Sequence, residues 1–190
     1  MSLAIVTPPA FEPEDIEIAK AWLRVDHATE DALLESLLKA ATRHIEGLTG
    51  RVLIDTTYEL TLQCFPSRIV LPKSPVRSVG PIAYVDMAEQ DQAFANYRLV
   101  NEGDGQTAII PELGAAWPHP APGSEVVVTF TAGMSTVSID DLPDQLKASV
   151  LIVTADLYEQ RQSGVYGSGS FARIPTGVAE LIQPFRRVVV

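Results

Sequence analysis

The sequence predicts an α+β protein: a helical bundle core, formed by N- and C-terminal helices, with an inserted antiparallel β module. Apolar residues recur at helical spacing near both ends of the 190-residue chain, and between these segments they alternate at every second position. The predicted parts are an N-terminal helical part (1–50), a β module (51–135), and C-terminal helices with a tail (136–190). The last part is expected to complete one helical domain with the first.

The N-terminal part contains two helix signals. Pro13 followed by Glu14 and Asp15 suits a helix start, because the φ of proline is helical and acidic side chains are stabilised near the positive end of the helix dipole. Residues 29–50 carry a stronger signal, with apolar residues at the 3.6-residue period and with Gly47 and Gly50 where a C-cap is expected. The residues of this apolar face are Leu33, Leu34, Leu37, Leu38, Ala41, Ile45 and Leu48.

The β module begins after Arg51, where the period of the apolar residues changes to two. Residues 54–62 alternate apolar or threonine side chains with polar ones, as a half-buried strand does. Turn-forming Pro, Gly and Asn clusters separate the further candidates, and residues 87–96 are expected to form a polar hairpin excursion. Short strands with such turns indicate an antiparallel sheet or small barrel. The further strand candidates are 68–71, 76–86, 97–100, 107–110 and 125–133.

The C-terminal part predicts two more helices and a strand-like end. Residues 140–162 contain the apolar stripe Leu146, Val150, Val153 and Leu157. After a Gly/Ser-rich stretch, residues 175–185 again show an apolar helical face. The final sequence RRVVV has strand character.

Charge and composition restrict the function. The net charge is −10 and no run of Lys or Arg occurs, whereas binding of nucleic-acid phosphates requires a basic face. Residues 161–190 differ, because they contain four arginines and one acid, Glu180. This region either meets an acidic surface of a partner or is simply solvated. No apolar run reaches the roughly 20 residues that span a bilayer, and the N-terminus lacks a basic leader, so a soluble cytoplasmic protein without membrane contact is expected.

The sequence offers no convincing catalytic or metal site. His27, His44 and His119 are far apart and show no ligand spacing, and the single cysteine, Cys64, excludes an internal disulfide or a Cys-rich zinc site. His44 is expected to be partly exposed, and Cys64 to fill space in or beside a strand. The acidic groups Asp140/Asp141 and Asp86/Glu89/Asp91 are explained by a helix start and a polar loop. We therefore expect no cofactor, no metal and no enzymatic activity.

The stretch GVYGSGS (164–170) does not predict a phosphate-binding loop. It has the spacing GxxGxG, lacks a following Lys, and comes after a helix instead of a strand. Its glycines and serines, with nearby aromatic and Arg side chains, are typical of an arm that contacts another protein. With the RRVVV end it forms the predicted interface to another protein subunit: Gly164, Tyr166, Gly167, Gly169, Phe171, Arg173, Arg186, Arg187, Val188, Val189 and Val190.

The chain resembles the head–tail connector, or adaptor, proteins of long-tailed phages, prophages and gene transfer agents. The resemblance lies in the AK-x-x-LRVD helix end, the helix D-x-L-x-x-x-L-x-x-A-x-x-x-I-E, and the strand entry TGR-x-L. It continues through VRSVGPIAYVD, VVVTFTAG, LPDQLKASVLIVTADLYEQR and PTGVAELIQPFR, and so covers nearly the whole chain.

This resemblance implies a helical core with a β insertion and a structural role without enzymatic activity. It implies a ring of about twelve copies under the portal protein, joining the DNA-filled head to the tail or its stopper and surrounding a channel for double-stranded DNA. The resemblance implies that the C-terminal segments 164–173 and 186–190 engage the portal. It also implies assembly in the cytoplasm followed by incorporation into the neck of the particle. A tail-completion, stopper or minor capsid protein is the alternative, and a small-ligand or enzymatic domain is a more distant one.

Overall fold

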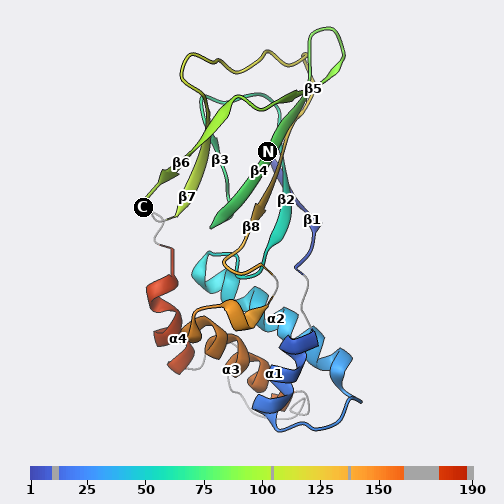
Figure 1. Cartoon of the computed structure of the whole chain (residues 1–190), viewed down its shortest axis with the longest axis vertical. Helices are drawn as coiled ribbons and strands as arrows, with labels where there is room; N and C mark the ends of the chain where they lie inside the picture. The colour runs from blue at the N-terminus through green and yellow to red at the C-terminus, as the bar shows by residue number, and fades with distance from the viewer. Residues whose placement is uncertain (10–12, 104, 137, 161–175, 188–190) are drawn as a thin grey trace, which may run out of the picture. The chain divides into compact units, whose positions relative to one another are not determined.

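The protein is described by a computed structural model that covers residues 1–9, 13–103, 105–136, 138–160 and 176–187 (Figure 1). It is an α+β structure with antiparallel sheets. The chain divides into two compact units. We call residues 1–9 and 55–134 the β unit, and residues 10–54 and 135–190 the helical unit.

In the helical unit, α2 and α3 each contact the other three α-helices. Three residues of the predicted stripe of α3, Leu146, Val150 and Val153, are buried, whereas the fourth, Leu157, is only half-buried. Val178 and Ile182 of the last helix are buried as well. The elements of this unit are α1 (Pro13–Leu23), α2 (Asp31–Thr49), η1 (Ile139–Asp141), α3 (Asp144–Gln160), α4 (Thr176–Ile182) and η2 (Gln183–Phe185).

Helix α2 confirms most of its predicted apolar face. Leu34, Leu38 and Ile45 are fully buried, but Leu33 is 37% exposed. Leu33 was therefore wrongly included in the buried face, because it lies to one side of the residues that pack inward. Of the two predicted C-cap glycines, Gly50 ends the helix in the left-handed conformation, with φ of 70°, whereas Gly47 lies within α2.

A buried carboxylate connects α1 to the start of the C-terminal helices. Asp15 is fully buried and accepts hydrogen bonds from the Ser138 hydroxyl (2.7 Å) and the Ile139 backbone N–H (2.9 Å). The Ser138 hydroxyl oxygen in turn accepts from the Asp140 N–H (3.0 Å) and caps η1. Asp15 thus has a tertiary partner 123 positions away, in addition to its place in the first turn of a helix.

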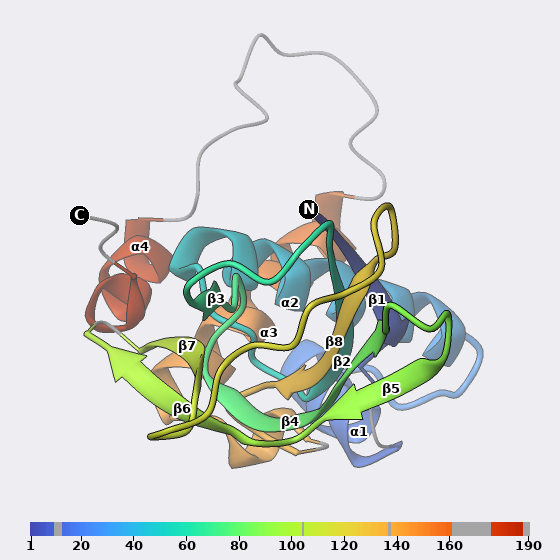
Figure 2. The same ribbon diagram turned by 90° about the horizontal axis from the view of Figure 1, so that it is seen from above.

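The β unit contains a five-stranded and a three-stranded antiparallel sheet. Figure 2 shows β6 and β7 of the second sheet beside β4 of the first, and the Tyr97 hydroxyl on β6 donates to the Val79 carbonyl on β4 (2.8 Å). The first sheet has the order β1 (Ser2–Thr7), β2 (Thr56–Leu62), β8 (Val126–Ala132), β4 (Val76–Val85) and β5 (Asp91–Phe94). The second has the order β3 (Ile69–Val70), β7 (Gln106–Pro111) and β6 (Tyr97–Glu102).

Buried side chains from both sheets form the core of the β unit. Leu60, Val128 and Ile82 of the first sheet and Ile109 of the second are fully buried. The rings of Tyr58 and Phe130 stack, with centroids 5.5 Å apart. The six predicted strand segments are therefore confirmed, and so is the hairpin after β4, whose second strand is β5.

Two features of the β unit differ from the expectations. Strand β1 was not predicted, because all six of its residues are exposed and they show no alternation of apolar and polar side chains. Cys64, expected to fill space, is exposed, because it lies in the turn that begins directly after β2.

Candidate protein interfaces

The C-terminal segment of the helical unit is fixed to the end of α2. The Arg51 Nε donates to the Phe185 carbonyl (2.8 Å), and the Arg187 N–H donates to the Thr49 carbonyl (2.8 Å). A Cβ on Gly50 would lie 3.3 Å from the Arg187 Cβ, so the glycine allows both the left-handed turn and the close approach. The Arg187 N–H also satisfies a carbonyl of the last turn of α2, which has no partner within its helix.

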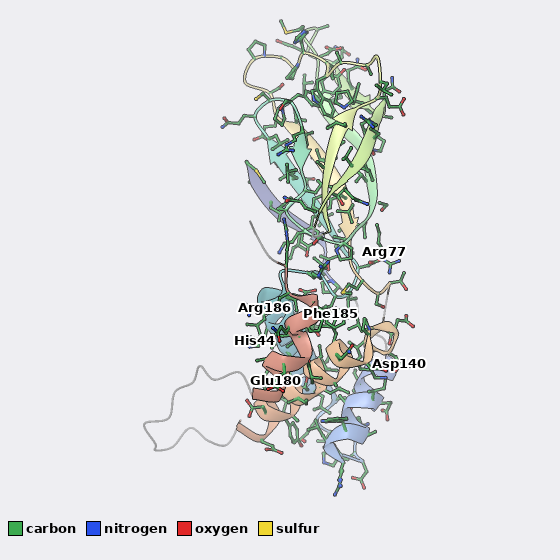
Figure 3. The ribbon with its side chains drawn as sticks, turned by 90° about the vertical axis from the view of Figure 1, so that its left-hand side faces the viewer. His44, Arg77, Asp140, Glu180, Phe185 and Arg186 are labelled. Atoms are coloured by element: carbon green, nitrogen blue, oxygen red, sulfur yellow. The ribbon has the colours of Figure 1, made fainter. Side chains whose placement is uncertain are left out.

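This anchor presents two arginine side chains. The Arg186 N–H donates to the Gln183 carbonyl (3.2 Å), and its side chain is exposed, while Arg187 is half-buried (Figure 3). Within residues 13–103, 105–136, 138–160 and 176–187, neither guanidinium takes part in an ion pair. Both are therefore available to an acidic surface.

The strand register gives the β unit two distinct ends. Thr7 pairs with Thr57, and Thr56 pairs with Ala132, so the chain enters and leaves the unit at one end of the first sheet. Leu62 pairs with Val126, and Val85 with Asp91, at the other end. Figure 1 shows loops gathered there. We call this the loop end, and define it by residues 63–68, 86–90 and 112–125.

Aromatic side chains hold the loop end together. The rings of Phe65 and Trp117 stack at 5.0 Å, and Trp117 lies 5.3 Å from the ring of Phe94 on β5. The Trp117 Nε1 donates to the Ser67 carbonyl (3.3 Å), and the Ala121 N–H donates to the Val85 carbonyl (2.8 Å). These contacts attach the loop around Trp117 to β4, to β5 and to the turn after β2.

Asp86 fixes the turn between β4 and β5. Its carboxylate accepts hydrogen bonds from the backbone N–H groups of Gln90 (3.0 Å) and Ala88 (2.8 Å) and from the Gln92 side chain (2.9 Å). These bonds, that of Gln90 foremost, hold the pKa of the Asp86 carboxyl below its ordinary value. The acid predicted to belong to a polar loop is thus a turn-forming residue.

A second acid of the β unit has the opposite shift. Burial raises the pKa of the Asp55 carboxyl, and the Arg77 guanidinium, with its Nε 2.8 Å from Asp55 Oδ1, counteracts part of this rise. The Arg77 Nε also donates to the Gly133 carbonyl (3.1 Å). Arg77 also donates to the Met134 carbonyl (2.7 Å) and therefore has a structural role here.

The comparison with known proteins supplies the identity of the family. The model of the phage gp6-like head–tail connector proteins matches residues 13–93. A chain in the neck of an empty gene transfer agent particle, computed with C6 symmetry, is 32% identical, with a TM-score of 0.79 over 100% of this chain and 97% of that chain. The chain belongs to the phage gp6-like head–tail connector family.

Two further particle structures match this connector. A chain of the virion of a native gene transfer agent is 32% identical, with a TM-score of 0.79 and coverage of 100% and 97% of the two chains. A chain in the neck of the native particle, with C12 symmetry, is 31% identical, with a TM-score of 0.72 and coverage of 98% and 97%. A search of curated protein sequences finds no match.

The family confirms the structural role expected from the resemblance. Its members are connector proteins of virus particles and not enzymes. In the part of this connector that the structure describes, no group of three or more His, Cys, Asp or Glu side chains is arranged to bind a metal ion. No described helix has the length and apolar character needed to cross a bilayer.

The predicted interface residues of the connector are placed only in part. Arg186 and Arg187 are brought together by the anchor on α2, which sequence reasoning missed because its partners are backbone carbonyls. The other predicted interface residues lie outside the described ranges: Gly164, Tyr166, Gly167, Gly169, Phe171, Arg173, Val188, Val189 and Val190.

Proposed function

We propose that this connector forms a ring of about twelve copies under the portal protein of a virus-like particle and joins the DNA-filled head to the tail. The supporting observation is the match over nearly the whole chain to neck proteins, one of them in a particle with C12 symmetry. In this proposal the helices of the helical unit form the bundle core of each copy. The β unit, which contains residues 1–9 as well as most of the predicted 51–135 module, is the inserted module. Assembly takes place in the cytoplasm, and the ring becomes part of the particle neck.

The proposed ring surrounds double-stranded DNA without reading its sequence. The net charge of −10 per copy supports this, because a strongly acidic protein repels the phosphates of a duplex and does not hold it in place. A stopper or tail-completion protein binds on the tail side of the ring.

The proposed contact with the portal is the C-terminal segment. The backbone N–H groups of Arg186 and Arg187 are already used within the helical unit, so strand addition to the portal is confined to residues 188–190. The two guanidinium groups, held at the end of α2, then pair with acidic side chains of the portal. The Gly/Ser arm, with Tyr166, Phe171 and Arg173, contacts the portal or a neighbouring copy.

Binding to the purified portal tests this function. We expect the double substitution Arg186→Glu and Arg187→Glu to weaken portal binding by tenfold or more, since two pairings become repulsions of about 1 kcal/mol or more each. The matched control is Arg98→Glu, which changes an exposed arginine on β6 and should leave binding unchanged.

Removing residues 188–190 tests the strand contribution separately, because the anchor at Arg187 is retained. Unchanged binding after both changes would contradict the C-terminal contact. Copurification with the tail tube protein, and not with the portal, would favour the alternative of a tail-completion or stopper protein.

A further inference from the structure

Strand β1 is an open edge of the five-stranded sheet. It pairs with β2 on one side only, and each of its residues, Ser-Leu-Ala-Ile-Val-Thr, is exposed. The outer side of an edge strand presents backbone N–H and C=O groups without a strand partner. Such an edge pairs readily with another chain.

The side chains of β1 add an apolar surface to this open edge. Leu3 lies directly opposite Leu60, and Ile5 opposite Tyr58. Cross-strand partners share one face of a sheet, so Leu3 and Ile5 lie on the face that buries Leu60 and Tyr58. Leu60 and Tyr58 are 0% and 4% exposed, whereas Leu3 and Ile5 are 37% and 54% exposed. The core face of the sheet therefore continues onto β1 without a cover.

The other sheet edges are protected, and β1 is not. The opposite edge, β5, has four residues and begins with Asp91, and β3 has two residues. The edge strand β6 carries Arg98. Strand β1 contains no proline and no charged side chain, and its register shift occurs only at its last pair. Folded proteins normally protect long apolar edges against association, so an unprotected edge indicates a surface that is covered after assembly.

We propose that β1, with Leu3 and Ile5, is the surface on which a second copy of this connector docks in the ring. The inference rests on the proposed ring. In a ring, each copy contacts its neighbour through two different surfaces in a head-to-tail manner, and β1 is one of these two surfaces. The match to a chain in a C12-symmetric neck favours a second copy as the occupant, because neighbouring copies are repeated around such a ring. The charge of this surface is compatible with that occupant, since two copies of net charge −10 repel least where their contact is nearly neutral. The β1–β2 pair has one charged side chain, Glu59, along its whole paired length.

The test compares two lysine substitutions in the full chain. Ile5→Lys places a charge in the docking surface, and Met87→Lys is the control, because Met87 is also an exposed apolar residue of the β unit, at 67%. Equal thermal unfolding of both variants and the wild type checks that the fold is retained. The number of associated copies is measured in two ways. Sedimentation velocity follows the chain alone over a wide concentration range, and native mass spectrometry follows mixtures of the chain with the portal.

We expect Ile5→Lys to weaken the association between copies by about tenfold or more at each contact, because the ammonium group must be desolvated there. Binding of a single copy to the portal should be unchanged, and Met87→Lys should resemble the wild type. If the wild type associates with itself but not with the portal, and Ile5→Lys abolishes that association, the inference holds and the portal proposal fails.

Three results would overturn the inference. The first is association of Ile5→Lys equal to that of Met87→Lys. The second is a loss of single-copy portal binding in Ile5→Lys, which would assign β1 to the portal. The third is a wild-type protein that shows no contact between copies, either alone or on the portal.

Discussion

The two units of this connector join distant parts of the chain by different means. In the helical unit, polar groups do so: Asp15 binds the segment at Ser138, and Arg51 binds the Phe185 carbonyl. In the β unit, backbone pairing and close packing do so, as in the contact of Gly133 with Asp55. A helix satisfies its interior backbone groups internally. Its links to other segments therefore come from side chains or from the unpaired groups of its end turns, as in the bond from the Arg187 N–H to the Thr49 carbonyl. A sheet already uses its backbone groups to join strands.

The largest effect should come from filling the space at Gly133. A Cβ there would lie 2.2 Å from Asp55 Oδ1 and 2.6 Å from the Asp55 backbone N, so the strand ends must move apart. We expect Gly133→Ala to lower the free energy of unfolding by about 3 kcal/mol. Chemical denaturation measures the change in the free energy of unfolding, and hydrogen exchange shows whether the backbone amides of the β unit lose protection.

The control for Gly133 lies in the same unit. A Cβ on Gly80 of β4 would lie 3.5 Å from the Thr129 carbonyl oxygen, an ordinary contact. Gly80→Ala should therefore leave exchange in β2 and β8 nearly unchanged. Equal losses in both variants would show that close backbone approach is not what holds these strand ends.

Removing the Asp15 carboxylate should have the next largest effect, and in the other unit. Asp15→Ala leaves the buried Ile139 N–H and Ser138 hydroxyl without this acceptor, which should cost about 2–3 kcal/mol. Hydrogen exchange should quicken in α1 and α3, while β2 and β8 keep their protection. Equal loss of protection in both units would show that the Asp15 hydrogen bonds do not act on the helical unit alone.

Truncating Trp117 should loosen the loop end. Its ring is half-buried between Phe65 and Phe94, so Trp117→Ala should cost about 2 kcal/mol, less than a fully buried ring. Limited proteolysis within residues 112–125 should become faster. Cleavage at the wild-type rate would show that the backbone bond at Ala121 is sufficient to hold the loop.

The smallest effect concerns pH. Because the folded-state pKa of Asp86 is below its unfolded value, its carboxylate stabilises the fold at pH above that unfolded value, and this contribution disappears as pH falls through the folded-state pKa. Asp86→Asn should reduce the loss of stability between neutral and strongly acidic pH. Thermal unfolding at a series of pH values measures this, and identical pH profiles would contradict it.

Much of the fold is readable from local sequence patterns. The 3.6-residue period located α2 and its C-cap at Gly50, and the period of two located β2. These features depend on residues close together in the chain, so the sequence alone determined them. The order and spacing of the same segments also carried the resemblance to the connector family, which the comparisons confirm.

The tertiary structure decided the features that depend on distant partners. Strand β1 exists because it pairs with residues 57–61, and its own six residues show no strand pattern. Arg187 is held by a backbone carbonyl of α2. Every residue has such a carbonyl, so the sequence does not indicate which one accepts the bond. The burial of Asp15 likewise follows from Ser138 and Ile139, far along the chain. Periodicity determines which face of an element is apolar, whereas packing determines which distant segment meets that face and which edge stays open.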